Sequence, residues 1–284
     1  MSAEGFLNAA HDQRDYEFRF LKKHGLRIAT YFTGNDIRSP RLMKELELET
    51  GRPNLGTYLG EVNRVFTSGG YEDTKRAIAT AANRYADIVF NADLDQRSYL
   101  NSPSHPFLYF HPDSEVTDDF TKFEHSAKRV IVHAPSAPIL KGTQLVRAAI
   151  DKLREEGYDF EYIELTGVSH DVVAQTLSRA HIALNEFYSY VPGVFGIEAM
   201  AAGCALLTSA DEHLDPQLPA GSNEAWLVTE HFQVTERLRE LLDDPSRTRT
   251  LAVAGRDWVL RHAVASVSGK AVEAILRQSL EQSR

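Results

Sequence analysis

The chain has 284 residues, with 31 lysines and arginines against 40 aspartates and glutamates, so its formal net charge is −9. Hydrophobic residues make up 43% and charged residues 25%, a balance that excludes a wholly disordered chain and favours a globular protein with sizeable cores. The negative charge argues against general nucleic-acid binding, which needs a basic face. No apolar run approaches the roughly 20 residues of a membrane-spanning helix.

Cell location is predicted from the N-terminus and the cysteine content. Residues 1–7 lack a basic stretch followed by an apolar one, so we expect no signal peptide. Cys204 is the single cysteine, which rules out a disulfide within the chain and suits a reducing compartment. We therefore expect a cytoplasmic protein, either free or peripheral at the inner face of the membrane.

The first part of the chain has an irregular pattern. Hydrophobic spacing predicts helices and strands here, but residues 51–70 are rich in glycine and asparagine and receive no assignment. A polar segment, 113–128, is predicted to be an interdomain linker. The predicted helices are 6–23 and 74–85, and the predicted strands are 27–33, 87–90 and 107–110.

From residue 129 on, strands and helices alternate with short connections. Short β-branched or apolar runs predict strands, and apolar residues at helical spacing predict the helices between them. The predicted strands are 129–133, 160–165, 182–184, 205–208 and 226–229. The predicted helices are 145–156, 172–180, one beginning at 197, 234–242 and 267–280.

This alternation is typical of right-handed βαβ units that build a parallel sheet covered by helices on both faces. We therefore predict an α/β protein with two domains. Residues 1–128 would form a shortened N-terminal α/β domain with its linker, and 129–284 a complete Rossmann-like, doubly wound domain with a closing helix.

Ligands of such sheets bind at the carboxyl ends of the strands, where helix N-termini offer amides to anions. Two loops there carry suitable residues. In the first, Lys141 could place an ammonium on a diphosphate, and Gly142 would let the backbone come close. The alternative is a surface lysine followed by a glycine that starts a helix.

The second loop has two glycines, Gly193 and Gly196, before a predicted helix whose first turn carries Glu198. Its amides could bind an anion, and the carboxylate could accept hydrogen bonds from sugar hydroxyls. The alternative is that Glu198 only complements the helix dipole.

These motifs resemble the donor-binding half of retaining GT-B glycosyltransferases, in particular the family-4-like group of bacterial polysaccharide synthesis. The resemblance is carried by the strand and loop Ile131–Gly142, which ends in Lys141-Gly142, and by Phe195-Gly196-Ile197-Glu198-Ala199-Met200-Ala201-Ala202-Gly203. Upstream, Phe32-Thr-Gly-Asn-Asp-Ile-Arg38 is similar to the Gly-x-Asp-x-Arg segment of that group's N-terminal domain.

The resemblance implies roles for particular residues. Lys141 would contact the diphosphate of a nucleotide-sugar donor, Glu198 would bind the ribose hydroxyls, and amides around 193–197 would hold the phosphates. No metal or other cofactor is expected. The implied donor-binding residues are Lys141, Gly142, Gly193, Val194, Phe195, Gly196, Ile197 and Glu198; the loop near the nucleobase holds Val168, Ser169 and His170; the acceptor or sugar side holds Gly34, Asp36, Arg38 and Tyr190.

Three positions depart from that group's pattern. The first glutamate of its Glu-x7-Glu motif falls on Tyr190, the arginine five residues before the lysine falls on Ser136, and a histidine before the Gly-x-Asp segment falls on Thr33. Each change removes a charge or a hydrogen bond at the reacting end of the site. Asp36 and Arg38 also have a structural interpretation, as a helix cap and a salt-bridge partner.

The leading hypothesis is a hexosyltransferase-type glycosyltransferase that moves a sugar from a nucleoside diphosphate to a glycan or a lipid-linked acceptor. One alternative is a catalytically degenerate GT-B homologue that binds a nucleotide or sugar or supports a partner transferase, with a partner protein supplying missing acceptor-site elements. Another keeps the fold but changes the reaction, as in a sugar-nucleotide epimerase.

Overall fold

The computed structural model describes residues 14–125 and 128–281. The chain folds as two compact units: Tyr109–Lys270 forms one, and the residues up to Leu108 together with those from Ala271 on form the other. The predicted boundary at residue 128 lies inside the larger unit, and each unit is described here by itself.

Within the described residues, the larger unit holds a five-stranded sheet in the order β4-β3-β5-β6-β7. All neighbouring strands are parallel; Ile131 of β3, for example, lies opposite Tyr162 of β4 and Ile182 of β5. The strand order changes direction between β3 and β5, which makes this pair the topological switch point of the sheet. The strands are β3 (Arg129–His133), β4 (Phe160–Glu164), β5 (Ile182–Leu184), β6 (Ala205–Thr208) and β7 (Leu227–Val228).

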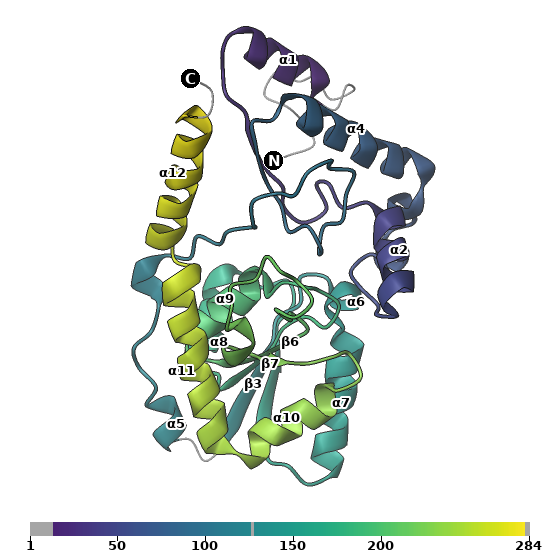
Figure 1. Cartoon of the computed structure of the whole chain (residues 1–284). Helices are drawn as coiled ribbons and strands as arrows, with labels where there is room; N and C mark the ends of the chain where they lie inside the picture. Colours follow the sequence, from purple (N-terminus) through teal and green to yellow (C-terminus); the bar gives the residue numbers. More distant parts are fainter. Residues whose placement is uncertain (1–13, 126–127, 282–284) are drawn as a thin grey trace. The chain divides into compact units, whose positions relative to one another are not determined.

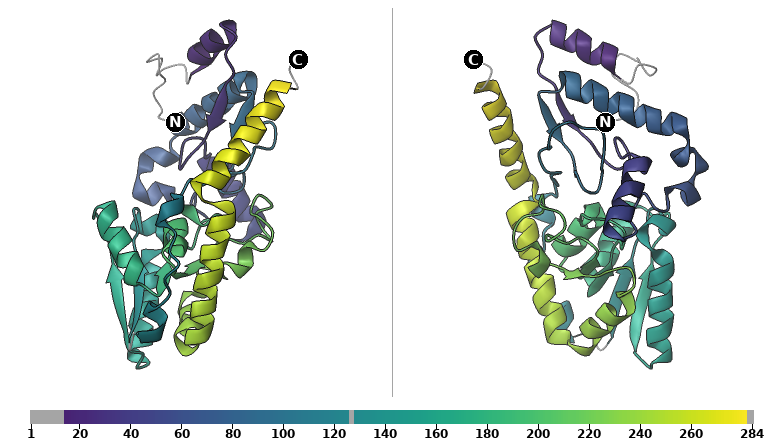
Figure 2. Two further views of the ribbon diagram at one scale, coloured as in Figure 1. Left: turned by 90° about the vertical axis from the view of Figure 1, so that its left-hand side faces the viewer. Right: turned by 45° about the vertical axis from the view of Figure 1, so that its right-hand side comes forward.

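Helices cover both faces of this sheet (Figure 1). They are α6 (Pro138–Lys141), α7 (Thr143–Glu155), α8 (His170–Arg179), α9 (Gly193–Ala201), α10 (Val234–Asp243) and α11 (Pro245–His262), with the short turns η3 (Asp113–Glu115), α5 (Lys122–His125) and η4 (Ser222–Glu224). The helices α7 and α10 lie side by side, and α11 runs along the side of the sheet away from α7 (Figure 2, right).

The face under α7 is a continuous apolar layer. The buried residues of α7, Val146, Ala149, Ile150 and Leu153, recur at helical spacing and therefore present one stripe to the strands. The stripe packs on the side chains that β3, β5 and β6 direct to this face. This packing fixes α7, and with it the turn that precedes it.

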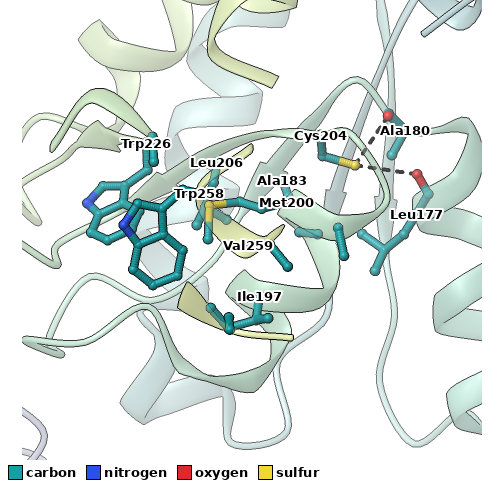
Figure 3. Close-up of a cluster of buried hydrophobic side chains, with 14 of the residues drawn as sticks. Leu177, Ala180, Ala183, Ile197, Met200, Cys204, Leu206, Trp226, Trp258 and Val259 are labelled. Atoms are coloured by element: carbon teal, nitrogen blue, oxygen red, sulfur yellow. Dashed lines mark hydrogen bonds between the residues drawn. The ribbon is translucent and has the colours of Figure 1, made fainter. Parts of the chain in front are cut away.

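The opposite face is packed by α8, α9 and α11 (Figure 3). Small residues of α9 let it lie close to the sheet, and Trp226 and Trp258 meet edge to face with ring centroids 5.3 Å apart. Cys204 is buried here, and its thiol donates to the carbonyl oxygens of Leu177 and Ala180 at 3.4 and 3.3 Å. Cys204 is therefore a packing residue.

In the smaller unit, the described residues contain a two-stranded parallel sheet of β1 (Ala29–Tyr31) and β2 (Ile88–Phe90). Its helices are α1 (Asp15–Lys23), α2 (Pro40–Thr50), α3 (Leu59–Val62) and α4 (Gly69–Tyr85), with the turn η2 (Arg64–Thr67). The helices α1 and α4 lie side by side (Figure 1). The last helix, α12 (Ala265–Glu281), begins in the larger unit and ends in the smaller one.

Most predicted elements of the larger unit are confirmed, three predictions need correction, and two long helices were not predicted. Residues 107–110 form no strand. The helices α2, which has Ser39 as its N-cap and Pro40 in its first turn, and α11 were not predicted. The segment 113–125 packs on the larger unit, because Phe120 and Phe123 enter its core, so this part of the chain is not a free linker. The third correction concerns α9, which was predicted to begin at residue 197 and begins at Gly193.

Two predictions extend beyond the described residues. Residues 6–13 of the first predicted helix and 126–127 of the predicted linker lie outside them.

None of the helices in the described part of the chain combines the length and the apolar character that a membrane crossing needs.

Candidate functional site

A cavity of about 390 Å³ lies at the switch point, beyond the carboxyl ends of β3 and β5. Parallel α/β sheets bind ligands at this place because the loops after the two strands separate there. Residues from both predicted loops and from α8 meet in it. Its lining consists of Ala134, Ser136, Lys141, His170, Val173, Asn185, Val194, Phe195 and Glu198.

Lys141 is the last residue of the short helix α6, which follows β3. The chain then turns through Gly142, whose φ of +73° is a left-handed conformation that favours glycine. A Cβ at Gly142 would also lie 3.3 to 3.5 Å from Leu145, Phe187 and Tyr188. The ammonium of Lys141 forms an ion pair with the carboxylate of Glu186, and its side chain remains 24% exposed.

The N-terminus of α9 forms another wall of the cavity. The first-turn amides of an α-helix have no acceptor within the helix, and the helix dipole makes this end positive, so it suits an anion. Gly193 has a φ of +64°, and its N–H donates to the hydroxyl oxygen of Tyr109 at 3.1 Å. Val194 is 61% exposed at this end of the helix, whereas Ile197 is 2% exposed and contributes only backbone to the site.

Asn185 fixes the start of α9. It follows β5 directly, and its side-chain amide donates to the carbonyl oxygen of Pro192 and, at 3.3 Å, to the hydroxyl of Thr208. A Cβ at Gly196 would lie 2.9 Å from the Asn185 amide nitrogen. Helix and loop therefore approach closely only because residue 196 is glycine. The sequence prediction that both glycines precede the helix is wrong, since they lie inside its first turn.

Glu198 lies in the second turn of α9 and faces His170, the first residue of α8. The imidazole Nε2 of His170 is 3.1 Å from Oε1 of Glu198. Both residues also line a neighbouring cavity of about 600 Å³ between α8, α9 and the segment 111–122. Lys141, His170 and Glu198, which come from separate sequence motifs, thus line the same cavity.

His133, the last residue of β3, connects the elements that carry the site. It is 1% exposed, and its Nδ1 lies 2.7 Å from the carbonyl oxygen of Leu184 and its Nε2 2.9 Å from the hydroxyl of Thr143. Burial lowers the pKa of His133, so the ring is neutral: Nδ1–H donates to the carbonyl and Nε2 accepts from the hydroxyl. His133 therefore joins β3, β5 and the start of α7.

The other predicted residues of this unit lie around the cavity. Ser136 lines it, and Val168, 42% exposed, lies with Ser169 in the loop that leads into α8. Tyr190 is 5% exposed and packed into the protein. A buried phenol thus stands where the resemblance implies a carboxylate.

The predicted residues of the smaller unit are held by local contacts. Arg38 is 4% exposed; its guanidinium pairs with the carboxylate of Asp95 at 2.7 Å and donates to the Asp95 carbonyl at 2.8 Å. The carboxylate of Asp36 accepts from the backbone N–H and the hydroxyl of Thr33 at 3.1 and 3.2 Å, closing the turn that contains Gly34. The structural interpretation is therefore wrong in its details, because Ser39 and not Asp36 caps α2, and Arg38 pairs with Asp95 and not with Asp36. An acceptor-side role of Gly34, Asp36 and Arg38 stays a prediction.

Three residues that hold parts of the site in place, Asn185, Glu186 and Tyr109, were not predicted. Asn185 and Glu186 are the first two residues after the buried strand β5, and polar residues at that place are a sequence signal for a sheet-edge site. Tyr109 lies outside the resembling segments and carries no such signal. Within the described ranges 14–125 and 128–281, no group of three or more His, Cys, Asp and Glu side chains has a metal-binding arrangement.

Residues 143–268 match a family described as "Glycosyl transferase-like". Comparison with curated proteins gives no match. Among solved structures, the chain is similar to the sucrose-phosphate synthase of Thermosynechococcus elongatus, at 16% identity over 95% of this chain and 78% of that one, with a TM-score of 0.60.

Two more solved structures show the same likeness. WaaG, a glycosyltransferase involved in lipopolysaccharide biosynthesis, is 14% identical over 97% of this chain and 85% of its own, with a TM-score of 0.59. HepE of Anabaena, in complex with UDP-glucose, is 12% identical over 93% and 76%, with a TM-score of 0.57. The chain has the GT-B glycosyltransferase fold. Its switch-point cavity belongs to the unit that contains the whole family match.

Proposed function

We propose that this chain is a glycosyltransferase that binds a nucleoside diphosphate sugar in the switch-point cavity and transfers the sugar to a hydroxyl of a glycan or lipid-linked acceptor. The observation that carries the proposal is the convergence of Lys141, Glu198 and the N-terminus of α9 on one cavity of a GT-B fold. A cation and a helix N-terminus suit a diphosphate, and a carboxylate suits vicinal sugar hydroxyls.

In the proposed reaction, the bond between the anomeric carbon and the diphosphate oxygen breaks, and the acceptor oxygen forms the new bond to that carbon. The acceptor hydroxyl gives its proton to a phosphate oxygen of the donor, and the leaving nucleoside diphosphate takes the bonding electrons. Lys141 and the first-turn amides of α9 would stabilise the negative charge that develops on it. In this proposal, side-chain and backbone groups of the protein stabilise the leaving nucleoside diphosphate, and no metal ion is required.

The comparisons give partial support for a donor of this kind. The solved HepE structure contains UDP-glucose, and WaaG is a glycosyltransferase of lipopolysaccharide biosynthesis. By analogy, the donor here would be a nucleotide sugar and the acceptor part of a surface glycan or glycolipid. The proposal includes transfer with retention of the anomeric configuration, and it leaves the base of the donor to the titration described below.

One observation favours the second candidate, a binding protein that does not catalyse transfer. Tyr190 is buried where the resemblance implies a glutamate, and Ser136 lines the cavity where it implies an arginine. Lys141 and Glu198, which we propose for the nucleotide end, are present in the cavity, whereas the reacting end lacks the two charges that the resemblance implies. Turnover of a bound nucleotide sugar by the purified chain, either to free sugar or to a glycosylated acceptor, decides between the two.

Binding is tested by calorimetric titration of the purified chain with UDP, GDP and ADP and with their glucose derivatives. We expect the nucleotides with one of the three bases to bind best. Lys141→Ala and Glu198→Ala should each lower the affinity for that nucleotide about 10-fold or more, because each removes a charge-assisted hydrogen bond worth about 1.5–3 kcal/mol. Lys152→Ala and Glu155→Ala, on the exposed face of α7, are the matched controls. Equal affinities in the wild type and all four variants would refute the assignment of this site.

A further inference from the structure

The two phosphate-binding elements of the proposed donor site are already in contact with acceptor atoms of this chain. The ammonium of Lys141 pairs with the carboxylate of Glu186, and the N–H of Gly193 donates to the hydroxyl of Tyr109. A diphosphate that reaches the site must therefore replace or share these contacts.

Glu186 holds a fixed position between the two elements. It lies two residues beyond the end of β5, and its carbonyl oxygen accepts a hydrogen bond from the N–H of Ser209 at 3.0 Å. Its side chain is only 3% exposed. A Cβ at Gly193 would lie 2.5 Å from Oε1 of Glu186, so the carboxylate lies directly against the first residue of α9. Its two oxygens thus face the lysine on one side and the helix start on the other.

We propose that Glu186 determines the affinity and the specificity of the donor site, because its carboxylate competes with the donor's diphosphate for Lys141 and the start of α9. This inference rests on the proposed function. The repulsion between two negative charges grows with the size of each charge. The Glu186 carboxylate therefore disfavours a ligand more strongly as the ligand's negative charge increases.

The specificity follows from the charges of donor and product. A nucleoside diphosphate has a terminal phosphate group with a second ionisation near pH 6, whereas the sugar blocks that ionisation in the nucleotide sugar. At pH 7.5 the product therefore carries about one more negative charge than the donor. Glu186 repels the product more, and so it favours the exchange of spent nucleoside diphosphate for fresh nucleotide sugar.

The test is the Glu186→Gln variant of the full chain, which keeps the shape of the side chain and an acceptor for Lys141 but removes the charge. Affinities of the best nucleoside diphosphate and of its glucose derivative are measured by calorimetry at pH 7.5. We expect the diphosphate to bind about 10-fold more tightly and the nucleotide sugar about 3-fold, a difference within reach of a single buried charge. Glu156→Gln, which removes a carboxylate paired with Arg239 on α10, is the control and should change neither affinity.

The outcomes separate the two proposals. If wild type binds and Lys141→Ala weakens binding, but Glu186→Gln leaves both affinities unchanged or weaker, Glu186 is no competitor and this inference fails alone. Equal tightening of both ligands would overturn the specificity. If wild type binds no nucleotide, this inference fails together with the proposed function.

A second variant keeps the test valid if Glu186→Gln does not fold, as judged by circular dichroism. Glu186→Asp keeps the charge and withdraws the carboxylate from Lys141 by one methylene. We expect it to bind the diphosphate about 3-fold more tightly than wild type, since the lysine is less occupied. An unchanged or lower affinity of a folded Glu186→Asp chain would also overturn the proposal.

Discussion

His170 and Glu198 meet at the boundary between two cavities of the larger unit. The imidazole Nε2 lies 3.1 Å from Oε1 of the carboxylate, and both side chains line the 390 Å³ cavity at the switch point and the 600 Å³ cavity beside it. The contact engages one carboxylate oxygen and leaves the other for a ligand hydroxyl. His170 therefore orients Glu198 for the role proposed for it.

Replacing His170 by alanine is expected to weaken nucleoside diphosphate binding about 3-fold, less than Glu198→Ala does, because it frees the carboxylate to rotate but does not remove it. Calorimetry on the purified variants measures this. Asp171→Ala, at the next position of α8, is the control. A loss as large as that of Glu198→Ala would mean that His170 contacts the ligand itself.

Gly193→Ala is expected to lower the free energy of unfolding by about 2 kcal/mol or more and to reduce nucleotide binding. The new Cβ would lie 2.5 Å from the Glu186 carboxylate, at a φ of +64° that side chains rarely adopt. Gly269→Ala in α12 is the matched control, since no atom lies within 4 Å of its Cβ, and it should stabilise by about 0.5–1 kcal/mol. Urea unfolding compares the two, and an equal effect of both changes would refute the close packing.

Stability should fall as the pH is lowered below about 6.5, in part because His133 is buried in its neutral form. Its folded pKa lies below its ordinary value, so the unfolded chain binds the proton first, and the contribution present above pH 6.5 is lost as the pH falls towards the folded pKa. His181, whose pKa is also lowered by burial, adds to the same slope.

Thermal unfolding between pH 7.5 and 5.5 checks this. His133→Gln is expected to be less stable at pH 7.5 and to show a shallower pH dependence than wild type. His213→Gln removes an exposed imidazole and should keep the wild-type slope. A slope that stays the same in His133→Gln would show that this residue does not contribute.

Arg38→Met is expected to destabilise the chain by about 3–5 kcal/mol, because it leaves the Asp95 carboxylate buried beside an apolar side chain. Arg97→Met removes a more exposed ion pair, with Glu49, and should cost no more than about 1 kcal/mol. Chemical denaturation of both variants gives the comparison. A fully stable Arg38→Met chain with reduced transfer activity would instead support an acceptor-side role.

The strands of the larger unit could be predicted from the sequence because each is a short apolar run between polar turns, as at 129–133 and 182–184. The start of α9 could not, since glycine has a low helix propensity and only the tertiary fit against Asn185 and Glu186 explains Gly193 and Gly196. The helix α2 was predictable from Ser39 and Pro40, whose capping pattern was not used.

Of the site, Lys141, His170 and Glu198 were predicted because each belongs to a motif on one stretch of chain. The Lys141–Glu186 pair joins residues 45 positions apart, and the contact of Tyr109 with Gly193 joins residues 84 apart. Such contacts depend on how the loops after β3 and β5 fold against each other. No local pattern encodes that geometry, so only the structure could reveal them.

The most direct test of the donor-site assignment is an experimental structure of the chain with the nucleoside diphosphate that binds best. We predict phosphate oxygens within hydrogen-bonding distance of Lys141 Nζ and of first-turn amides of α9, with ribose hydroxyls on the Glu198 carboxylate. A diphosphate bound in another cavity, or no bound nucleotide at millimolar concentration, would contradict the assignment.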